Sequence, residues 1–169
     1  QAVRGILPEA GGISLRVDGQ VRPERYAGVV IATAPYHAST LLADLPHAAP
    51  EKALIDALAW EPIVTAYLAY PPDVRLPAPM IGTTGGLGQW VFDRGQLGGA
   101  PGLLAVVISA SGRHQALQRD DLAQALHDEL VAILPGLPAP YWTQVVAEKR
   151  ATFSCVPGLM RPSVQTGID

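Results

Sequence analysis

The order of apolar and polar side chains predicts a β-hairpin near the start of the chain. Residues 13–17 alternate between the two kinds, which is typical of a strand with one exposed face. Asp18 and Gly19 then have the composition of a tight turn, and Val21 resumes an extended segment. We therefore expect paired strands on a half-exposed sheet.

A continuous apolar run over residues 26–33 predicts a different kind of strand. It ends at Ala34 and Pro35 and shows no alternation, which is the pattern of a strand buried on both faces. We expect a helix to follow it, through Leu42.

The middle of the chain predicts a helix, a strand and a loop. Pro50 suits the first turn of a helix, and Glu51 lies favourably near the positive end of that helix. The helix should end near residues 60–62, where the β-branched and aromatic residues 63–70 begin a strand. Two prolines end this strand, and a loop rich in proline and glycine follows over residues 71–88.

The last part of the chain predicts three strands and a helix. Residues 89–93 and 103–110 flank a glycine-rich turn, which indicates two neighbouring antiparallel strands. In residues 120–134 the apolar positions recur at helical spacing, which predicts a helix with one buried stripe. The stripe consists of Leu122, Ala125, Leu126, Leu130, Ile133 and Leu134. Residues 143–154 form a last extended stretch.

Together these elements predict the α+β fold class, with a mixed, largely antiparallel sheet and a few packed helices. There is no repeat of solenoid period and no evident linker, so we expect residues 1–169 to form a single domain around one sheet. The chain begins in strand-like sequence without an initiating methionine, and residues 161–169 have no pattern of a helix or strand. We therefore expect an internal fragment of a longer protein.

Composition narrows the classes of function. Of the 169 residues, 49% are hydrophobic and 16% are charged, against about 25% charged in ordinary soluble domains. The chain can therefore bury a core, and part of its surface should be less polar than average. The net charge is -3 and the basic residues are scattered, which argues against nucleic-acid binding.

Cysteine content and hydropathy bear on the compartment. Cys155 is the single cysteine, so no internal disulfide can form, and no histidine stands at the spacing of a zinc site. We expect no metal and a cytoplasmic location. The longest apolar run has the length of a strand, so no membrane span is predicted, while peripheral contact with the inner membrane face stays open.

Few residues suggest chemistry by themselves. The glycine-dense residues 82–88 match neither a GxGxxG nor a Walker sequence, and an ordinary flexible loop is favoured. His37 is interpreted as a surface or capping residue, and Cys155 as a small buried one. Residues 148–150 carry opposite charges within a strand, which is typical of a solvated face.

One cluster stands at a strand end. Trp90, Asp93 and Arg94 occupy a position where ligand contacts often lie, although a β-turn with an ion pair explains them equally well. From the residues alone, the function stays unknown.

The order of several segments resembles known flavoenzymes. The opening with Val3, the hairpin and the run that ends at Pro35 are similar to a stretch of flavin-containing amine oxidoreductases and phytoene desaturases. Most of the remaining chain resembles the squalene-associated FAD-dependent desaturases, also described as hydroxysqualene dehydroxylases of bacterial hopanoid synthesis. This likeness is carried by residues 67–71, 89–95, 104–110 and 148–153, by Trp142, and by the pairs Pro157-Gly158 and Arg161-Pro162.

The resemblance implies an FAD-dependent oxidoreductase. The dinucleotide fingerprint and the closing Gly-Asp flavin segment of the family do not occur in these residues, so the chain would hold most of the substrate domain and the strands that return to the FAD-binding domain. The isolated chain is then expected to bind no FAD and to be inactive. The surfaces that the FAD-binding domain covers should make it a homo-oligomer, most simply a twofold dimer.

The implied activity is the reductive dehydroxylation of hydroxysqualene to squalene, with a hydrophobic isoprenoid as substrate. A carotenoid desaturase of the phytoene type and a non-catalytic binding domain are the alternatives.

The resemblance also assigns positions. Val3 would contact the adenine side of FAD through its backbone, and Ala32, Thr33 and Ala34 would border the flavin. The substrate-side candidates are Trp90, Asp93 and Arg94. No catalytic residue is identified.

Overall fold

The computed structural model describes residues 1–163. Of residues 161–169, for which no helix or strand is expected, those after residue 163 lie outside the described part. The chain separates into two compact units. The first unit comprises Gln1–Ala59 and the described residues from Cys155 on, and the second unit comprises Trp60–Ser154. The expectation of one sheet is wrong, because three strands of the first unit form a sheet separate from the five-stranded sheet of the second.

The sheet of the first unit is an antiparallel meander. Its strands are β1 (Val3–Glu9), β2 (Gly12–Val17) and β3 (Gln20–Val21). The turn between β2 and β3 contains Asp18 and Gly19, both with positive φ, a conformation that aspartate tolerates and glycine adopts freely. This confirms the predicted hairpin.

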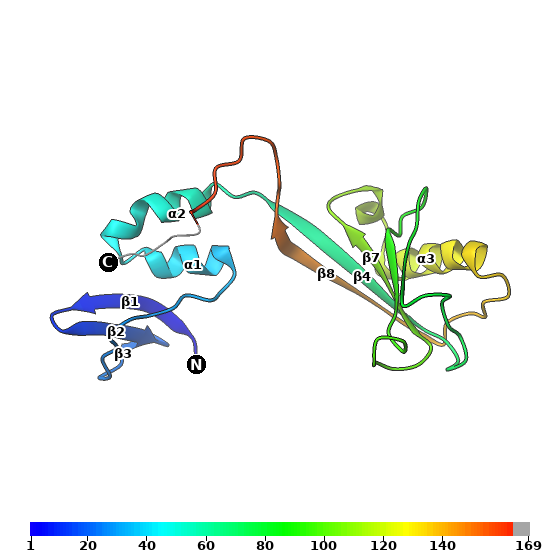
Figure 1. The fold of residues 1–169 in the computed structure, drawn as a ribbon, viewed down its shortest axis with the longest axis horizontal. Coiled ribbons are helices and arrows are strands. Elements are labelled where there is room, and N and C mark those ends of the chain that lie inside the picture. Colours follow the sequence, from blue (N-terminus) through cyan, green and yellow to red (C-terminus); the bar gives the residue numbers. More distant parts are fainter. Residues whose placement is uncertain (164–169) are drawn as a thin grey trace. The chain divides into compact units, whose positions relative to one another are not determined.

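Helices complete the first unit (Figure 1). They are α1 (Pro35–Leu42), the short η1 (Pro46–Ala48) and α2 (Ala49–Asp56). Each begins with a proline at its first or second position, where the missing N–H costs no hydrogen bond. Ser39 of α1 donates to the carboxylate of Asp56, which also pairs with Lys52 at 2.5 Å. Both predicted helices are confirmed, and α2 ends before residues 60–62.

The strand predicted over residues 26–33 is absent from the described structure. Tyr26 forms only an isolated bridge with Ile13, and residues 27–33 have no regular structure. The side chain of Val30 is 91% exposed. A strand of this apolar composition requires partner strands and covering layers, and the described residues supply neither to this segment.

The second unit contains a five-stranded antiparallel sheet in the order β5-β6-β7-β4-β8. Its strands are β4 (Trp60–Ala69), β5 (Met80–Gly82), β6 (Trp90–Asp93), β7 (Leu103–Ser109) and β8 (Trp142–Phe153). The predicted pairing of the neighbours β6 and β7 is confirmed. The segment predicted as a loop over residues 71–88 contains the three-residue β5, which is too short for sequence periodicity to reveal.

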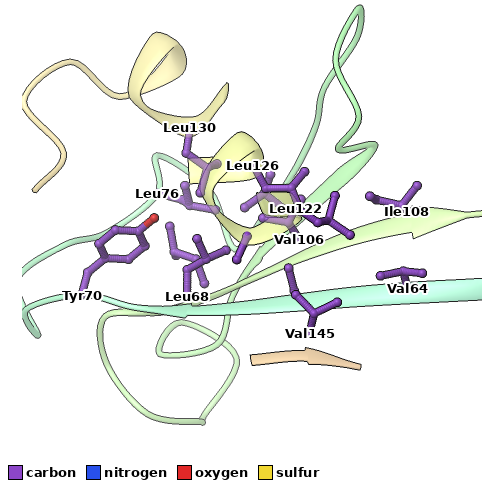
Figure 2. Close-up of a cluster of buried hydrophobic side chains, with 14 residues drawn as sticks. Val64, Leu68, Tyr70, Leu76, Val106, Ile108, Leu122, Leu126, Leu130 and Val145 are labelled. Carbon is purple, nitrogen blue, oxygen red and sulfur yellow. The ribbon is translucent and has the colours of Figure 1, made fainter. Parts of the chain in front are cut away.

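A single α-helix, α3 (Arg119–Ile133), packs on this sheet, after the short η2 (Arg113–Ala116). Figure 2 shows Leu122, Leu126 and Leu130 of α3 directed toward Leu68 and Val145 of the sheet. The predicted helix and these three positions are confirmed.

The predicted stripe is wrong at Ile133, whose side chain is 42% exposed. It is the last residue of α3, and periodicity gives the direction of a side chain but not whether a sheet lies beneath it. Ala123 and His127 are buried instead.

Candidate functional site

The second unit has one covered and one open sheet face. Successive side chains of a strand point to opposite faces. On β4, Val64, Ala66 and Leu68 belong to the core cluster with α3, so Thr65 and Tyr67 point to the other face. The open face comprises Ile63, Thr65 and Tyr67 of β4, Leu103, Ala105, Val107 and Ser109 of β7, Trp90 and Phe92 of β6, Met80 of β5, and Trp142, Gln144, Val146 and Glu148 of β8.

The open face is mostly apolar and rich in aromatic side chains, and its one charged residue, Glu148, stands at the edge beside Ile63. In one cross-strand row Phe92, Ala105, Tyr67 and Gln144 stand side by side in register. Several other side chains of this face are about half exposed, among them Met80, Trp90, Trp142 and Val146. Large exposed apolar patches mark binding surfaces in folded proteins. This face is therefore the best candidate for a site that takes a hydrophobic ligand.

The predicted cluster at the end of β6 is divided between the two faces. Trp90 lies on the open face. Asp93 lies on the covered face and is buried. Arg94 is exposed in the turn that follows. The structure thus does not bring these three residues to one site.

Asp93 has a structural environment. Its carboxylate accepts hydrogen bonds from the backbone N–H of Leu76 at 3.0 Å, from the backbone N–H of Gln96 at 3.1 Å and from the side-chain amide of Gln96 at 2.7 Å. Burial raises the pKa of Asp93, but these bonds, with one from the backbone of Gly95, outweigh it and hold that pKa below its ordinary value. Among the described residues its partners are amides, so the alternative of an ion pair with Arg94 is not observed either.

The glycine-dense segment is a hairpin tip held by a carboxylate of the protein. Glu129 of α3 accepts hydrogen bonds from the backbone N–H groups of Leu87 at 2.6 Å and Gly88 at 2.9 Å. A Cβ at Gly86 would stand 2.5 Å from the Glu129 carboxylate. Glycine is needed there for this close approach, which explains the composition without a bound phosphate.

A cavity of about 720 Å³ occupies the first unit. Its walls are apolar side chains of β1, β2, α1 and α2 together with residues 27–31. Two polar residues, His47 and Glu51, also line it. The irregular segment 27–31 thus contributes to one wall of a hollow, although the side chain of Val30 itself is exposed.

The positions predicted to border FAD surround the start of α1. Ala32 and Thr33 are exposed, and Ala34 is the N-cap residue of α1. Val3 begins β1 and is 42% exposed. Small exposed side chains, and a segment whose backbone forms no ladder among the described residues, fit the close approach of a flat ring system. Contact with FAD itself stays a prediction.

The sequence interpretations of His37 and Cys155 have different outcomes. His37 is exposed on α1 beside Tyr36, which agrees with a surface residue. Cys155 is exposed, so its interpretation as a buried residue is wrong. Its neighbours end β8 and begin irregular chain, where the sequence carries no burial pattern.

Tyr67 and the open face were not identified from the sequence. The alternation within residues 63–69 places Ile63, Thr65 and Tyr67 on one side of a strand. That signal is present, but it does not say which side a helix covers. Residues 1–163 contain no cluster of side chains suited to holding a metal ion, and none of their helices is both long and apolar enough to cross a membrane.

The family model and the known relatives that match this chain agree with each other. A model of the family described as flavin containing amine oxidoreductase matches residues 1–157. The hydroxysqualene dehydroxylase of Rhodopseudomonas palustris is 33% identical over 142 residues, which cover 82% of this chain and 30% of that protein. The hydroxysqualene dehydroxylase of Sinorhizobium fredii is 30% identical over 143 residues, with 82% and 30% covered. The chain thus spans about a third of the length of these relatives.

Solved structures agree in fold. A proposed protoporphyrinogen oxidase from Exiguobacterium sp. 255-15 superposes with a TM-score of 0.64 at 16% identity, covering 92% of this chain and 36% of that one. An oxidoreductase from Methanosarcina mazei gives a TM-score of 0.60 at 14% identity, covering 88% and 37%. At this identity the likeness shows the fold, and it confirms the predicted α+β class with antiparallel sheets.

Proposed function

The chain belongs to the family of flavin-containing amine oxidoreductases, and we propose that it is the substrate-side part of a longer FAD-dependent oxidoreductase. The open face of the second unit would then form one wall of the substrate cavity. The observation that carries this proposal is the face itself, a sheet surface of aromatic and aliphatic side chains opposite the helix-covered core. The other walls would come from parts of the protein beyond this chain.

The proposed substrate is a hydroxylated C30 isoprenoid, and the proposed reaction is its reductive dehydroxylation to the hydrocarbon. Two relatives that cover most of this chain are named hydroxysqualene dehydroxylases, which favours this reaction over carotenoid desaturation and over a non-catalytic binding domain. The reaction exchanges a C–O bond for a C–H bond, takes up two electrons and two protons, and releases water. FAD supplies the electrons when it is bound in reduced form.

The residues of this chain have two proposed tasks. Those of the open face exclude water and bind the hydrocarbon chain, because burying apolar surface contributes about 25 cal/mol per Å². Val3 would meet the adenine side of FAD through its backbone, and Ala32, Thr33 and Ala34 would border the flavin. The exposure of Val3, Ala32 and Thr33 supports this contact.

A substrate of this kind dissolves in lipid rather than in water. We propose that the complete enzyme works in the cytoplasm and draws its substrate from the inner membrane face by peripheral contact.

The reaction itself is tested in the complete protein. Purified with FAD and supplied with a reductant, it should convert hydroxysqualene to squalene, measured by mass spectrometry of the extracted lipid. Phytoene should give no desaturated product. Desaturation of phytoene without dehydroxylation would support the carotenoid alternative, and a complete protein that binds neither FAD nor isoprenoid would support a non-catalytic domain.

A further inference from the structure

We infer that Tyr67 binds the hydroxyl group of the isoprenoid substrate, an inference that rests on the proposed function. A substrate with one polar group on a long hydrocarbon needs one polar contact in an apolar wall to fix which carbon meets the reacting centre. The open face offers few groups for this contact.

Polar groups gather on one side of the open face. Tyr67 stands in register with Gln144 of β8, and Thr65 lies two residues before it on the same side of β4. Across β7 the neighbours are aromatic, with Phe92 in the row of Tyr67 and Trp90 in the row of Thr65. The hydroxyl and amide groups of these two rows thus lie on β4 and β8, and the aromatic side chains of the same rows lie on β6.

In the row of Phe92, Ala105, Tyr67 and Gln144, the larger side chains cover Ala105. Ala105, between Phe92 and Tyr67, is only 4% exposed although it points to the open face. The surface presented there is consequently made by its larger neighbours, an aromatic one and a phenol. A ligand that lies across this row meets the Tyr67 side chain directly.

The two tyrosines of this region differ in their partners. The hydroxyl of Tyr70 is hydrogen-bonded to His127 inside the core. Tyr67 is partly exposed, and among residues 1–163 its hydroxyl has no hydrogen-bond partner. When a hydrocarbon covers the open face, this hydroxyl loses water, and leaving it unpaired is unfavourable. The hydroxyl of the substrate can exchange a hydrogen bond with it, whereas the hydrocarbon product cannot.

This difference makes the inference testable by binding alone. In the complete oxidised enzyme, where no reduction occurs, the affinities for hydroxysqualene and squalene are measured by the change in flavin fluorescence. Tyr67→Phe should weaken hydroxysqualene binding about three- to tenfold, the size of one hydrogen bond. Squalene binding should stay equal or become tighter, because the variant has no hydroxyl to leave unpaired. Tyr141→Phe is the matched control, because it removes the same atom from a side chain that is 72% exposed and lies outside the open face.

Each other outcome overturns the inference in a recognisable way. Equal loss for both ligands would assign Tyr67 to apolar packing, and no loss for either would remove it from the site. Those two results leave the proposed function intact, because the wild-type enzyme still binds isoprenoid. A wild-type enzyme with bound FAD that takes neither ligand would overturn the proposed function and this inference together.

Discussion

The hydroxyl of Tyr70 lies 3.1 Å from Nδ1 of His127, and the two side chains are buried together between β4 and α3. Tyr70 follows the last residue of β4, and His127 lies in the middle of α3, 57 positions later. Burial raises the pKa of Tyr70, so the phenol stays protonated throughout the physiological range. The pair links the helix to the end of β4, the strand that carries Tyr67.

Tyr70→Phe should destabilise the second unit by about 1–3 kcal/mol, because Nδ1 of His127 would be left in the core without its partner. Urea unfolding followed by tryptophan fluorescence measures this, since Trp60, Trp90 and Trp142 all belong to the second unit. Tyr141→Phe should change the free energy of unfolding by less than about 0.5 kcal/mol. Equal stability of the two variants would mean that the Tyr70–His127 bond contributes nothing.

Leu126→Ala should lower the stability of the second unit by about 2–5 kcal/mol, the usual range for a buried leucine. Leu126 is 1% exposed, and its removal leaves a cavity between α3 and the sheet. Ile133→Ala on the same helix is the control, with an expected loss below about 1 kcal/mol because Ile133 is half exposed. A loss below about 0.5 kcal/mol for Leu126→Ala would show that α3 does not cover this face.

Asp93→Asn should destabilise the second unit by about 1–3 kcal/mol at neutral pH, since the new amide N–H₂ would meet the donors of Leu76 and Gln96. Asp73→Asn, at an exposed position of the loop that precedes Leu76, should be neutral.

Stability at low pH shows whether the ionised form of Asp93 is the one that stabilises the fold. Because the folded state lowers the pKa of Asp93, its contribution is present above the unfolded pKa of about 3.9 and is lost as the pH falls through the folded value. The stability difference between wild type and Asp93→Asn should therefore shrink below about pH 4. A difference that stays constant to pH 2 would rule out a role of the charge.

The 169-residue chain on its own should not bind FAD tightly, because no phosphate-binding fingerprint occurs in it. It should also associate, most simply as a twofold dimer, through apolar surfaces such as the open face and the exposed segment around Val30. Gel filtration with FAD, read by flavin absorbance, and light scattering at several concentrations test the two statements. A flavin band that elutes with the protein would contradict the first, and a monomer at high concentration the second.

Local patterns predicted the hairpin, the three α-helices and most strands, because turns, prolines and periodicity act within a few residues. Pairing is a property of the surroundings, so residues 26–33 had the composition of a buried strand without the partners to form one. The division into two units was also missed. Nothing in the composition around Ala59 and Cys155 marks the boundary, which only the contacts define.

The candidate site was predictable only in part. Trp90 was singled out and lies on the open face. Asp93 was grouped with it, although residues three apart in a strand point to opposite faces of the sheet. The partners of Asp93 come from Leu76 and Gln96, in loops whose paths no periodicity specifies. Tyr67 could be recognised as a residue of the open face only because the structure shows which face of β4 α3 covers.

The central claim is that the open face contacts the isoprenoid, and a pair of matched substitutions tests it most directly. Val146 on the open face and Val131 on α3 are both exposed, at 46% and 37%, so an aspartate is tolerated by the fold at either position. In the complete enzyme, Val146→Asp should lower kcat/KM for hydroxysqualene at least about tenfold, since a carboxylate that a bound hydrocarbon chain covers loses its water at a cost of more than 1.4 kcal/mol. Val131→Asp should retain the wild-type value, and both variants should keep their bound FAD. Wild-type turnover by Val146→Asp would contradict the account.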